Sequence, residues 1–174
     1  MAKTIRMTLN PQSIDKAIIE LEAYNRDLPK KAEQIIQRLA DYGVSVARVG
    51  FSNVYYDGVN DVQVEIEDKG ELHKAVVAQG QAVLFIEYGT GVHFADNHPK
   101  KPDGILGRGE YGKGRGSNDW WIYSGQPGTA GGELVNGRTN ATITHGNPAN
   151  PVMYNTTDFM RNVIGKVVKE VFGA

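Results

Sequence analysis

The chain has 174 residues, of which 40% are hydrophobic and 22% charged, a composition that predicts one folded domain and excludes a disordered chain. The formal net charge is −1, so no overall charge attracts the chain to nucleic acid or to an anionic membrane. Cysteine is absent, which excludes disulfides, thiolate nucleophiles and cysteine metal sites. We expect neither a signal peptide nor a membrane span, because no apolar run has the required pattern.

The N-terminal third predicts a short strand and two helices. Thr4–Leu9 alternates polar and apolar residues, as an edge strand does, and Asn10-Pro11 then favours a helix start. The first helix should end before Pro29, and a second should run from Pro29 to about Gly50. The apolar face of the first helix consists of Ile14, Ala17, Ile18 and Leu21.

Three strands are predicted next. Val62–Glu67 alternates apolar and acidic residues, Leu72–Ala78 follows a tight turn, and Val83–Tyr88 follows a second turn. Short turns between successive strands predict an antiparallel β-meander. With two helices packed on one face, the expected fold is a single α+β domain over residues 1–174. The third strand should be central and buried, and Glu87 and Tyr88 should emerge from it just before a glycine turn.

A glycine-rich insertion, residues 92–144, interrupts this pattern. Eleven of the chain's 21 glycines lie between Gly104 and Gly137, and apolar residues are few there. We therefore expect a flexible loop or β-arm that becomes ordered when it docks on a partner. Within it, Trp120–Tyr123 resembles a strand that Thr139–Thr144 can pair with. Trp120 and Trp121 are candidate partner contacts, since aromatic residues on such an arm favour a binding role.

The last helix is predicted to begin at Asn155, with Asp158 completing a variant of the capping box. Its apolar face is wide and needs either the domain's own sheet or a neighbouring subunit to cover it. The candidate partner contacts on this helix are Phe159, Val163, Val167 and Phe172. The full face consists of two rows, Phe159, Val163, Val167, Val171 and Met160, Ile164, Val168, Phe172.

Two groups of residues match patterns found in binding or catalytic sites. Gly107–Gly114 matches part of a phosphate-binding loop, but it follows no buried strand, opens no helix and lacks the hydroxyl residue after Lys113, so we reject nucleotide binding. The only group that suits a metal or acid–base site has two histidines five residues apart around an aspartate. No regular element fixes their spacing, so exposed or turn-capping side chains are the preferred interpretation. This candidate cluster is Glu87, His93, Asp96 and His98.

Two separated stretches form a pair of motifs. The first is aromatic–Ile–Glu–aromatic–Gly–Thr–Gly, and the second is a proline, an aliphatic residue, methionine and an aromatic residue before the last helix. They include Phe85, Glu87, Tyr88, Gly89 and Gly91 in the first stretch and Pro151, Met153 and Tyr154 in the second. Together the two stretches resemble a family of small tailed-bacteriophage proteins, the tail-component or tail-completion proteins of the head–tail junction. Val152 stands in the second stretch where phenylalanine is common in that family.

The resemblance implies a virion structural protein of the neck, a minor tail component without catalytic residues, cofactor or metal. It implies a homo-oligomeric ring, expected to be sixfold from the usual symmetry of phage necks and tails. The implied partners are other copies of the chain, the connector or head-closure protein and the tail-terminator protein. DNA passes through such a ring without sequence-specific binding, and no membrane is involved. The implied locations are the virion and, during assembly, the host bacterial cytoplasm.

Two other functions are consistent with the residues. The first is a small metal-assisted hydrolase that uses Glu87, His93, Asp96 and His98. The second is nucleic-acid binding through the glycine-rich arm, where residues 100–115 carry five basic and two acidic side chains. Metal content would distinguish the hydrolase from the structural protein, and a steep salt dependence of DNA affinity would indicate the second function.

Overall fold

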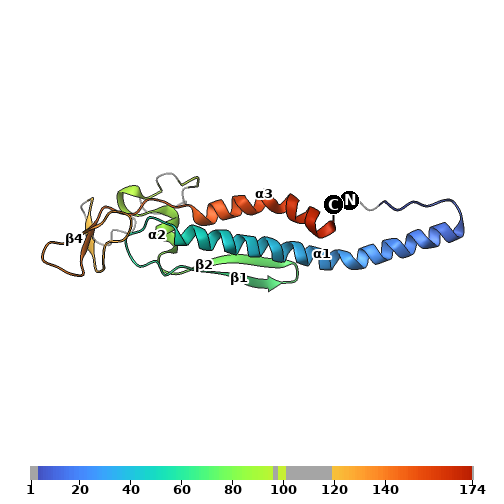
Figure 1. Ribbon diagram of the computed structural model, residues 1–174, viewed down its shortest axis with the longest axis horizontal. Coiled ribbons are helices and arrows are strands. Elements are labelled where there is room, and N and C mark those ends of the chain that lie inside the picture. Colours follow the sequence, from blue (N-terminus) through green and yellow to red (C-terminus); the bar gives the residue numbers. More distant parts are fainter. Residues whose placement is uncertain (1–3, 96–97, 101–118, 174) are drawn as a thin grey trace.

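A computed structural model describes residues 4–95, 98–100 and 119–173. The described residues form an elongated α+β fold, which confirms the predicted class (Figure 1). The helices are α1 (Pro11–Ser52), α2 (Val83–Tyr88) and α3 (Val152–Phe172), with a short 3₁₀ turn η1 (Gly91–His93). The strands are β1 (Gln63–Gly70), β2 (His73–Gln79), β3 (Trp121–Tyr123), β4 (Glu133–Leu134) and β5 (Thr142–Thr144).

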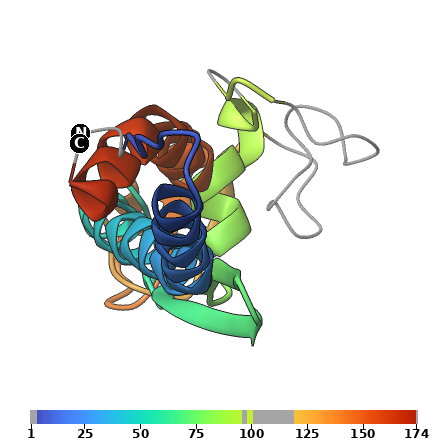
Figure 2. The ribbon, with the colours of Figure 1, turned by 90° about the vertical axis from the view of Figure 1, so that its right-hand side faces the viewer.

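Helix α1 is the long axis of the molecule. It lies between α3 on one side and the β1–β2 hairpin on the other, as the end-on view shows (Figure 2). The guanidinium of Arg48 joins α1 to the hairpin, because its Nε and Nη2 atoms donate to the Val64 carbonyl oxygen at 3.0 and 2.8 Å. The core lies where α1, β1, α2 and α3 meet, and consists of Val44, Ala47, Phe51, Val64, Ala82, Ile86 and Val152.

Helices α1 and α3 pack antiparallel and close together. A Cβ atom added at Gly43 would lie 2.6 Å from the Met160 sulfur, and one at Gly50 would lie 2.5 Å from Val152. These glycines therefore allow the two helices to approach. At the other end of the contact, the Lys31 ammonium lies 4.6 Å from the centre of the Phe172 ring. The end of α3 thus meets α1 near residue 31, and α1 continues for about five more turns beyond it.

The two predicted N-terminal helices are a single helix, so that prediction is wrong. Pro29 lies inside α1, where it cannot donate to the carbonyl of Asn25. Both residues are exposed, so water can satisfy that carbonyl. The predicted strand at Thr4–Leu9 is also wrong: this segment is extended but pairs with no described strand, and Asn10 ends it by accepting a hydrogen bond from the Ser13 backbone N–H.

The predicted meander is a two-stranded hairpin. β1 and β2 pair antiparallel as expected, but the predicted third strand, Val83–Tyr88, is helix α2. The Asp61 carboxylate favours this helix, because it accepts hydrogen bonds from the backbone N–H groups of Gln81 and Ala82 at 2.8 and 2.9 Å. Ala82 and Ile86 are then buried one helical turn apart.

The described part of the insertion contains the second sheet, in the order β3–β5–β4. Trp121 pairs with Thr144 and Tyr123 with Thr142, which confirms the predicted pairing of these two segments. The sheet lies at the end of the molecule where α1 ends and α3 begins (Figure 1). The glycine-rich run 101–118, including the rejected phosphate-loop match, lies outside the described residues, as does the expectation that this run is flexible.

Candidate functional site

The two stretches that carry the family resemblance lie against each other in the fold, because the backbone N–H groups of Met153 and Tyr154 donate to the Glu87 carboxylate. Residues beside the two stretches extend this contact. The Thr90 N–H donates to the Asn147 carbonyl at 2.9 Å, the Val92 N–H to that of His145 at 3.2 Å, and the Asn150 N–H to that of Ile86 at 2.8 Å. We call this contact between residues 86–92 and 145–154 the junction. It connects α2 to the start of α3 and is the candidate functional site.

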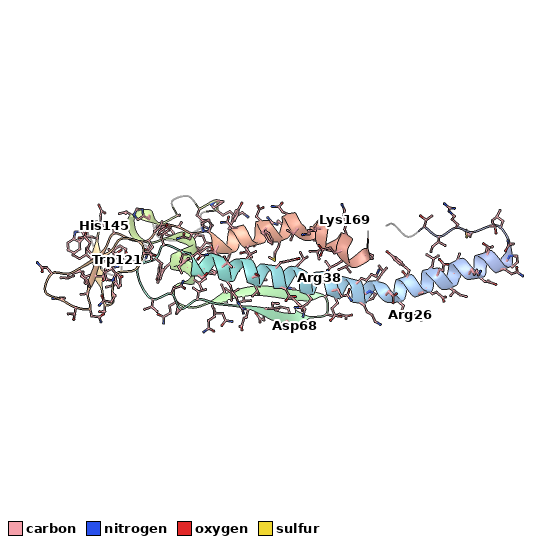
Figure 3. All side chains as sticks on the ribbon, in the orientation of Figure 1. Arg26, Arg38, Asp68, Trp121, His145 and Lys169 are labelled. Atoms are coloured by element: carbon pink, nitrogen blue, oxygen red, sulfur yellow. The ribbon has the colours of Figure 1, made fainter. Side chains whose placement is uncertain are left out.

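Glycines allow the backbones of the junction to come this close. A Cβ atom at Gly89 would lie 2.7 Å from the Asn147 carbonyl oxygen. One at Gly91 would lie 2.5 Å from the His145 carbonyl oxygen and 2.7 Å from the Trp121 ring. Trp121 therefore packs on the Gly-x-Gly turn, and Figure 3 shows it at the same end of the molecule as His145.

Glu87 is buried at the centre of the junction and caps α3. Its Oε2 atom accepts from the Met153 backbone N–H at 2.8 Å, and its Oε1 atom from that of Tyr154 at 3.0 Å. These are N–H groups of the first helical turn, which have no partner within the helix. A carboxylate there is also stabilised by the helix dipole. The predicted helix start at Asn155 is therefore wrong: α3 begins at Val152, with its cap supplied by a residue of α2.

His98 completes the shell around this carboxylate. Its Nδ1 atom accepts from the Lys100 backbone N–H at 3.0 Å, so the Nε2 atom carries the proton and donates to Glu87 Oε1 at 3.3 Å. The imidazole lies between two tyrosines of the resembling stretches, with ring centres 4.5 Å from Tyr88 and 6.0 Å from Tyr154. The glutamate thus has three donors and an aromatic cover.

A second buried carboxylate, Asp57, connects the junction to the small sheet. It accepts from the backbone N–H groups of Gly128 and Ala130, at 3.0 and 3.2 Å, and from the Thr144 hydroxyl at 3.4 Å. Its own backbone N–H donates to the Asn147 side chain, which is itself buried. Sequence reasoning missed Asp57 and Asn147, because an aspartate before a glycine is typical of an exposed turn.

Thr90 contributes the remaining polar contact of the junction. Its hydroxyl oxygen accepts from the backbone N–H of Asn147 at 2.9 Å and from its side-chain amide at 3.3 Å. Together with Glu87 and Asp57, it gives the junction buried polar groups that are hydrogen-bonded within the chain. Such a network fixes one arrangement of the backbone and leaves these carboxylates little freedom to exchange partners.

A pocket of about 340 Å³ opens beside Glu87, between α2 and the first turns of α3. Its surface is mostly apolar, and the residues that line it include the basic residues Lys100 and Arg161. A pocket of this size with few convergent polar groups can accept a side chain or the end of a peptide. It is lined by Val83, Leu84, Glu87, Tyr88, His98, Lys100, Met153, Tyr154, Thr157, Asp158 and Arg161.

The structure brings together only part of the predicted metal or acid–base cluster. Glu87 and His98 are neighbours, His93 is exposed, and Asp96 lies outside the described residues. Among the described residues, no three histidine, aspartate or glutamate side chains are grouped closely enough to hold a metal ion. The two acidic oxygens of Glu87 both accept hydrogen bonds from α3, so the geometry is that of a helix cap.

Four groups around the hairpin and the small sheet have shifted pKa values. The Lys74 ammonium lowers the pKa of Asp68 on β1. The backbone N–H groups of Ala82 and Gln81 lower the pKa of Asp61, which agrees with its role before α2. Burial raises the pKa of Tyr56, with a further contribution from the Asp61 carboxylate. Burial likewise raises the pKa of Tyr123. Both phenols therefore stay neutral at physiological pH, and that of Tyr123 donates to the Gln126 carbonyl at 2.9 Å.

The candidate partner contacts have different environments. Trp120 is 42% exposed, whereas Trp121 is partly covered by the junction. On α3, Val167 is fully buried within the chain, and Phe159 is 37% exposed beside the Tyr42 ring. Val163 and Phe172 are half-buried, as is Phe85 of the resembling stretch. Pro151 is the residue immediately before α3.

Comparisons of this chain with protein-family models, with curated proteins and with solved structures find no match. The family resemblance therefore depends on the sequence alone. Across the ranges that the structure describes, no helix combines the length and the apolar composition needed to span a membrane.

Proposed function

We propose that this chain is a non-enzymatic structural subunit of a tailed-bacteriophage virion, a tail-completion or minor tail component that forms a ring at the head–tail junction. Its proposed partners are further copies of itself, the connector or head-closure protein and the tail terminator. DNA passes through the ring without sequence-specific contacts. The proposed locations are the virion neck and, before assembly, the bacterial cytoplasm.

The observation that carries this proposal is the part of α1 that neither α3 nor the hairpin covers. Residues 11–28 extend beyond both α3 and the hairpin (Figure 1), and expose Ile14, Ile18 and Leu21 on one side. A helix of this length is marginal in water without tertiary packing. A subunit of an assembly gains such packing from its neighbour, whereas a monomeric protein rarely exposes a continuous apolar surface of this kind.

The junction gives independent support. The two resembling stretches are far apart in the sequence, yet they hydrogen-bond to each other, and Glu87, Gly89 and Gly91 each have a specific structural role there. A motif that builds a scaffold is what a structural family would share. The alternative hydrolase would need Glu87 as a metal ligand or base, but α3 already occupies both of its oxygens.

The test is deletion of the coding sequence from the phage or prophage that carries it, followed by electron microscopy of the particles. The proposal expects separate filled heads and tails, with joining restored by the purified protein. Gold-labelled antibody should locate the chain at the neck of complete virions. Normal virions from the deletion strain would refute the proposal. Stoichiometric metal, lost in a His93→Ala, His98→Ala double variant together with a hydrolytic activity, would favour the hydrolase.

A further inference from the structure

The unpaired part of α1 continues the face that α3 covers. A regular α-helix makes five turns in 18 residues, so Ile14, Ala32 and Gly50 lie along one line of α1. Gly50 is in contact with α3 through Val152, and Lys31, next to Ala32, covers the Phe172 ring at the end of α3. From there to the N-terminus of α1 the same face has no helix on it. We call residues 11–28 the overhang.

The overhang has an ordered apolar stripe. The stripe follows the i, i+4, i+7 spacing of one helix face and consists of Ile14, Ile18 and Leu21. These residues are 37%, 48% and 52% exposed, respectively. Asp15 and Glu22, seven residues apart, lie along one edge of this stripe. The overhang as a whole carries four acidic and two basic residues, a net charge of −2.

Helix α3 has a matching surface that its own α1 leaves open. On α3, Val167 is fully buried, whereas Ile164 and Val168 of the neighbouring apolar row are 49% and 36% exposed. Gly165 lies beside them, and a Cβ atom there would meet nothing within 4 Å, so a second helix can approach closely. The charged residues of α3 are Asp158, Arg161, Lys166, Lys169 and Glu170, a net charge of +1.

We propose that the overhang of one copy packs on the outer face of α3, around Ile164 and Val168, in a second copy of this chain. This inference rests on the proposed function and specifies the contact that builds the ring. The acidic edge of Asp15 and Glu22 then faces the basic residues Arg161 and Lys169 of the second copy. Pairing of two overhangs is disfavoured, because it brings two surfaces of net charge −2 together.

The proposed contact joins two different surfaces, so it is heterologous. A heterologous contact leaves one free overhang and one free α3 face at the ends of every open oligomer, and repetition closes it into a ring or extends it into a filament. The overhang is about 27 Å long and α3 about 32 Å, so the two helical surfaces are also matched in length. Figure 3 shows the arrangement within one copy: Arg26 lies on α1 beyond the end of α3, whereas Arg38 lies alongside it.

The absence of cysteine makes cross-linking a direct test. Single-cysteine variants Ile18→Cys and Ile164→Cys of the full chain, one carrying a mass tag, are mixed and treated with a short bismaleimide. The proposal expects a mixed 18–164 product in at least tenfold excess over a mixed 19–164 product. Ile19→Cys is the matched control, because Ile19 is 64% exposed but lies on another side of α1. A predominant 18–18 product, or equal yields from positions 18 and 19, would overturn the proposal.

Charge reversal provides a second test, with sedimentation velocity as the readout. Asp15→Lys, Glu22→Lys and Arg161→Glu, Lys169→Glu double variants should each weaken self-association about tenfold or more, and a mixture of the two should recover it. These side chains are exposed, so circular dichroism should show unchanged folding. Association unaffected by either reversal would overturn the contact. If the protein is found at the virion neck but both tests fail, the proposed contact is refuted and the proposed function is not. If the specific cross-link forms but the protein is absent from virions, the proposed function is refuted and the contact is not.

Discussion

Glu87 precedes Met153 by 66 residues, and its Oε2 atom accepts a hydrogen bond from the Met153 backbone N–H at 2.8 Å. The same carboxylate binds the next N–H of α3 and the imidazole of His98. The long-range cap therefore links a six-residue helix, a 21-residue helix and the loop after the Gly-x-Gly turn.

Replacement of this carboxylate should weaken the whole domain. We expect Glu87→Gln to lower the free energy of unfolding by about 2 kcal/mol, because hydrogen bonds to a charged group contribute more than neutral ones and the amide cannot accept at both of its atoms. Urea unfolding followed by circular dichroism measures this. Glu133→Gln, at an exposed position of β4, is the matched control and should change little. Equal stability of the two variants would contradict the capping role.

The close backbone contact in the junction should make Gly146 irreplaceable. Gly146 has a φ of +119°, and an added Cβ would overlap the Thr90 carbonyl oxygen. Gly131 has a similar φ of +96° with no atom within 4 Å of the added Cβ. Substitution there therefore measures the cost of the positive φ without a steric overlap. We expect Gly146→Ala to be about 1–3 kcal/mol more destabilising than Gly131→Ala in thermal or urea unfolding. Equal effects would mean that the junction adjusts easily.

Replacing either of two glycines inside helices by alanine should change the stability of the protein, in opposite directions at the two sites. Gly165→Ala fills open space on α3 and should stabilise the protein by about 0.5–1 kcal/mol, since alanine favours the helix. Gly43→Ala should destabilise it, because the added methyl group would collide with Met160 and Val76. The difference in melting temperature between the two variants measures this. Stabilisation by both would contradict the tight packing of α1 on α3.

The shifted Asp61 predicts a pH dependence of stability. The N–H groups of Ala82 and Gln81 hold its folded-state pKa below the ordinary 3.8. Its stabilising contribution is therefore complete above that ordinary value and is lost as the pH falls through the lower, folded-state pKa. Asp61→Asn should be less stable than the parent at neutral pH, and the two unfolding midpoints should converge in acid.

The comparison requires urea unfolding midpoints from neutral pH to well below the ordinary carboxyl pKa of 3.8. Asp27→Asn, at an exposed site on the overhang, controls for the loss of one surface charge. A constant difference between Asp61→Asn and the parent across this range would show that ionisation of Asp61 makes no contribution to stability.

Where local pattern decides the structure, the sequence was sufficient to predict it. Alternation around Val64 and Ile66 predicts β1, and its tight turn predicts β2. The pairing of the segments that contain Trp121 and Thr144 was also predictable, from two short runs of strand-forming residues across a glycine-rich connection, although their register was not. The α+β class and the apolar face of the last helix depend on the same kind of periodicity.

Where distant partners decide the structure, sequence patterns failed. Val83–Tyr88 is too short for periodicity to separate strand from helix, and the Asp61 carboxylate before it favours the helix. The start of α3 depends on Glu87, which no local capping motif reveals. Pro29 is accommodated because its lost hydrogen bond is at an exposed position. The Thr4–Leu9 pattern is that of a strand, but a strand needs a neighbour, and none is present in the described ranges.

The position of the Glu87 cap also affects how the chain matures on the ribosome. Helix α2 is synthesised well before α3. The Glu87 carboxylate and Ile86 therefore lack their contacts with Met153 and Val152 until 66 more residues have been synthesised. During that interval the nascent chain has α1 and the hairpin but an open core at Val152, which is a substrate for chaperones. Completion of the domain is therefore expected to be a late folding step, slowed by the long loop that must close.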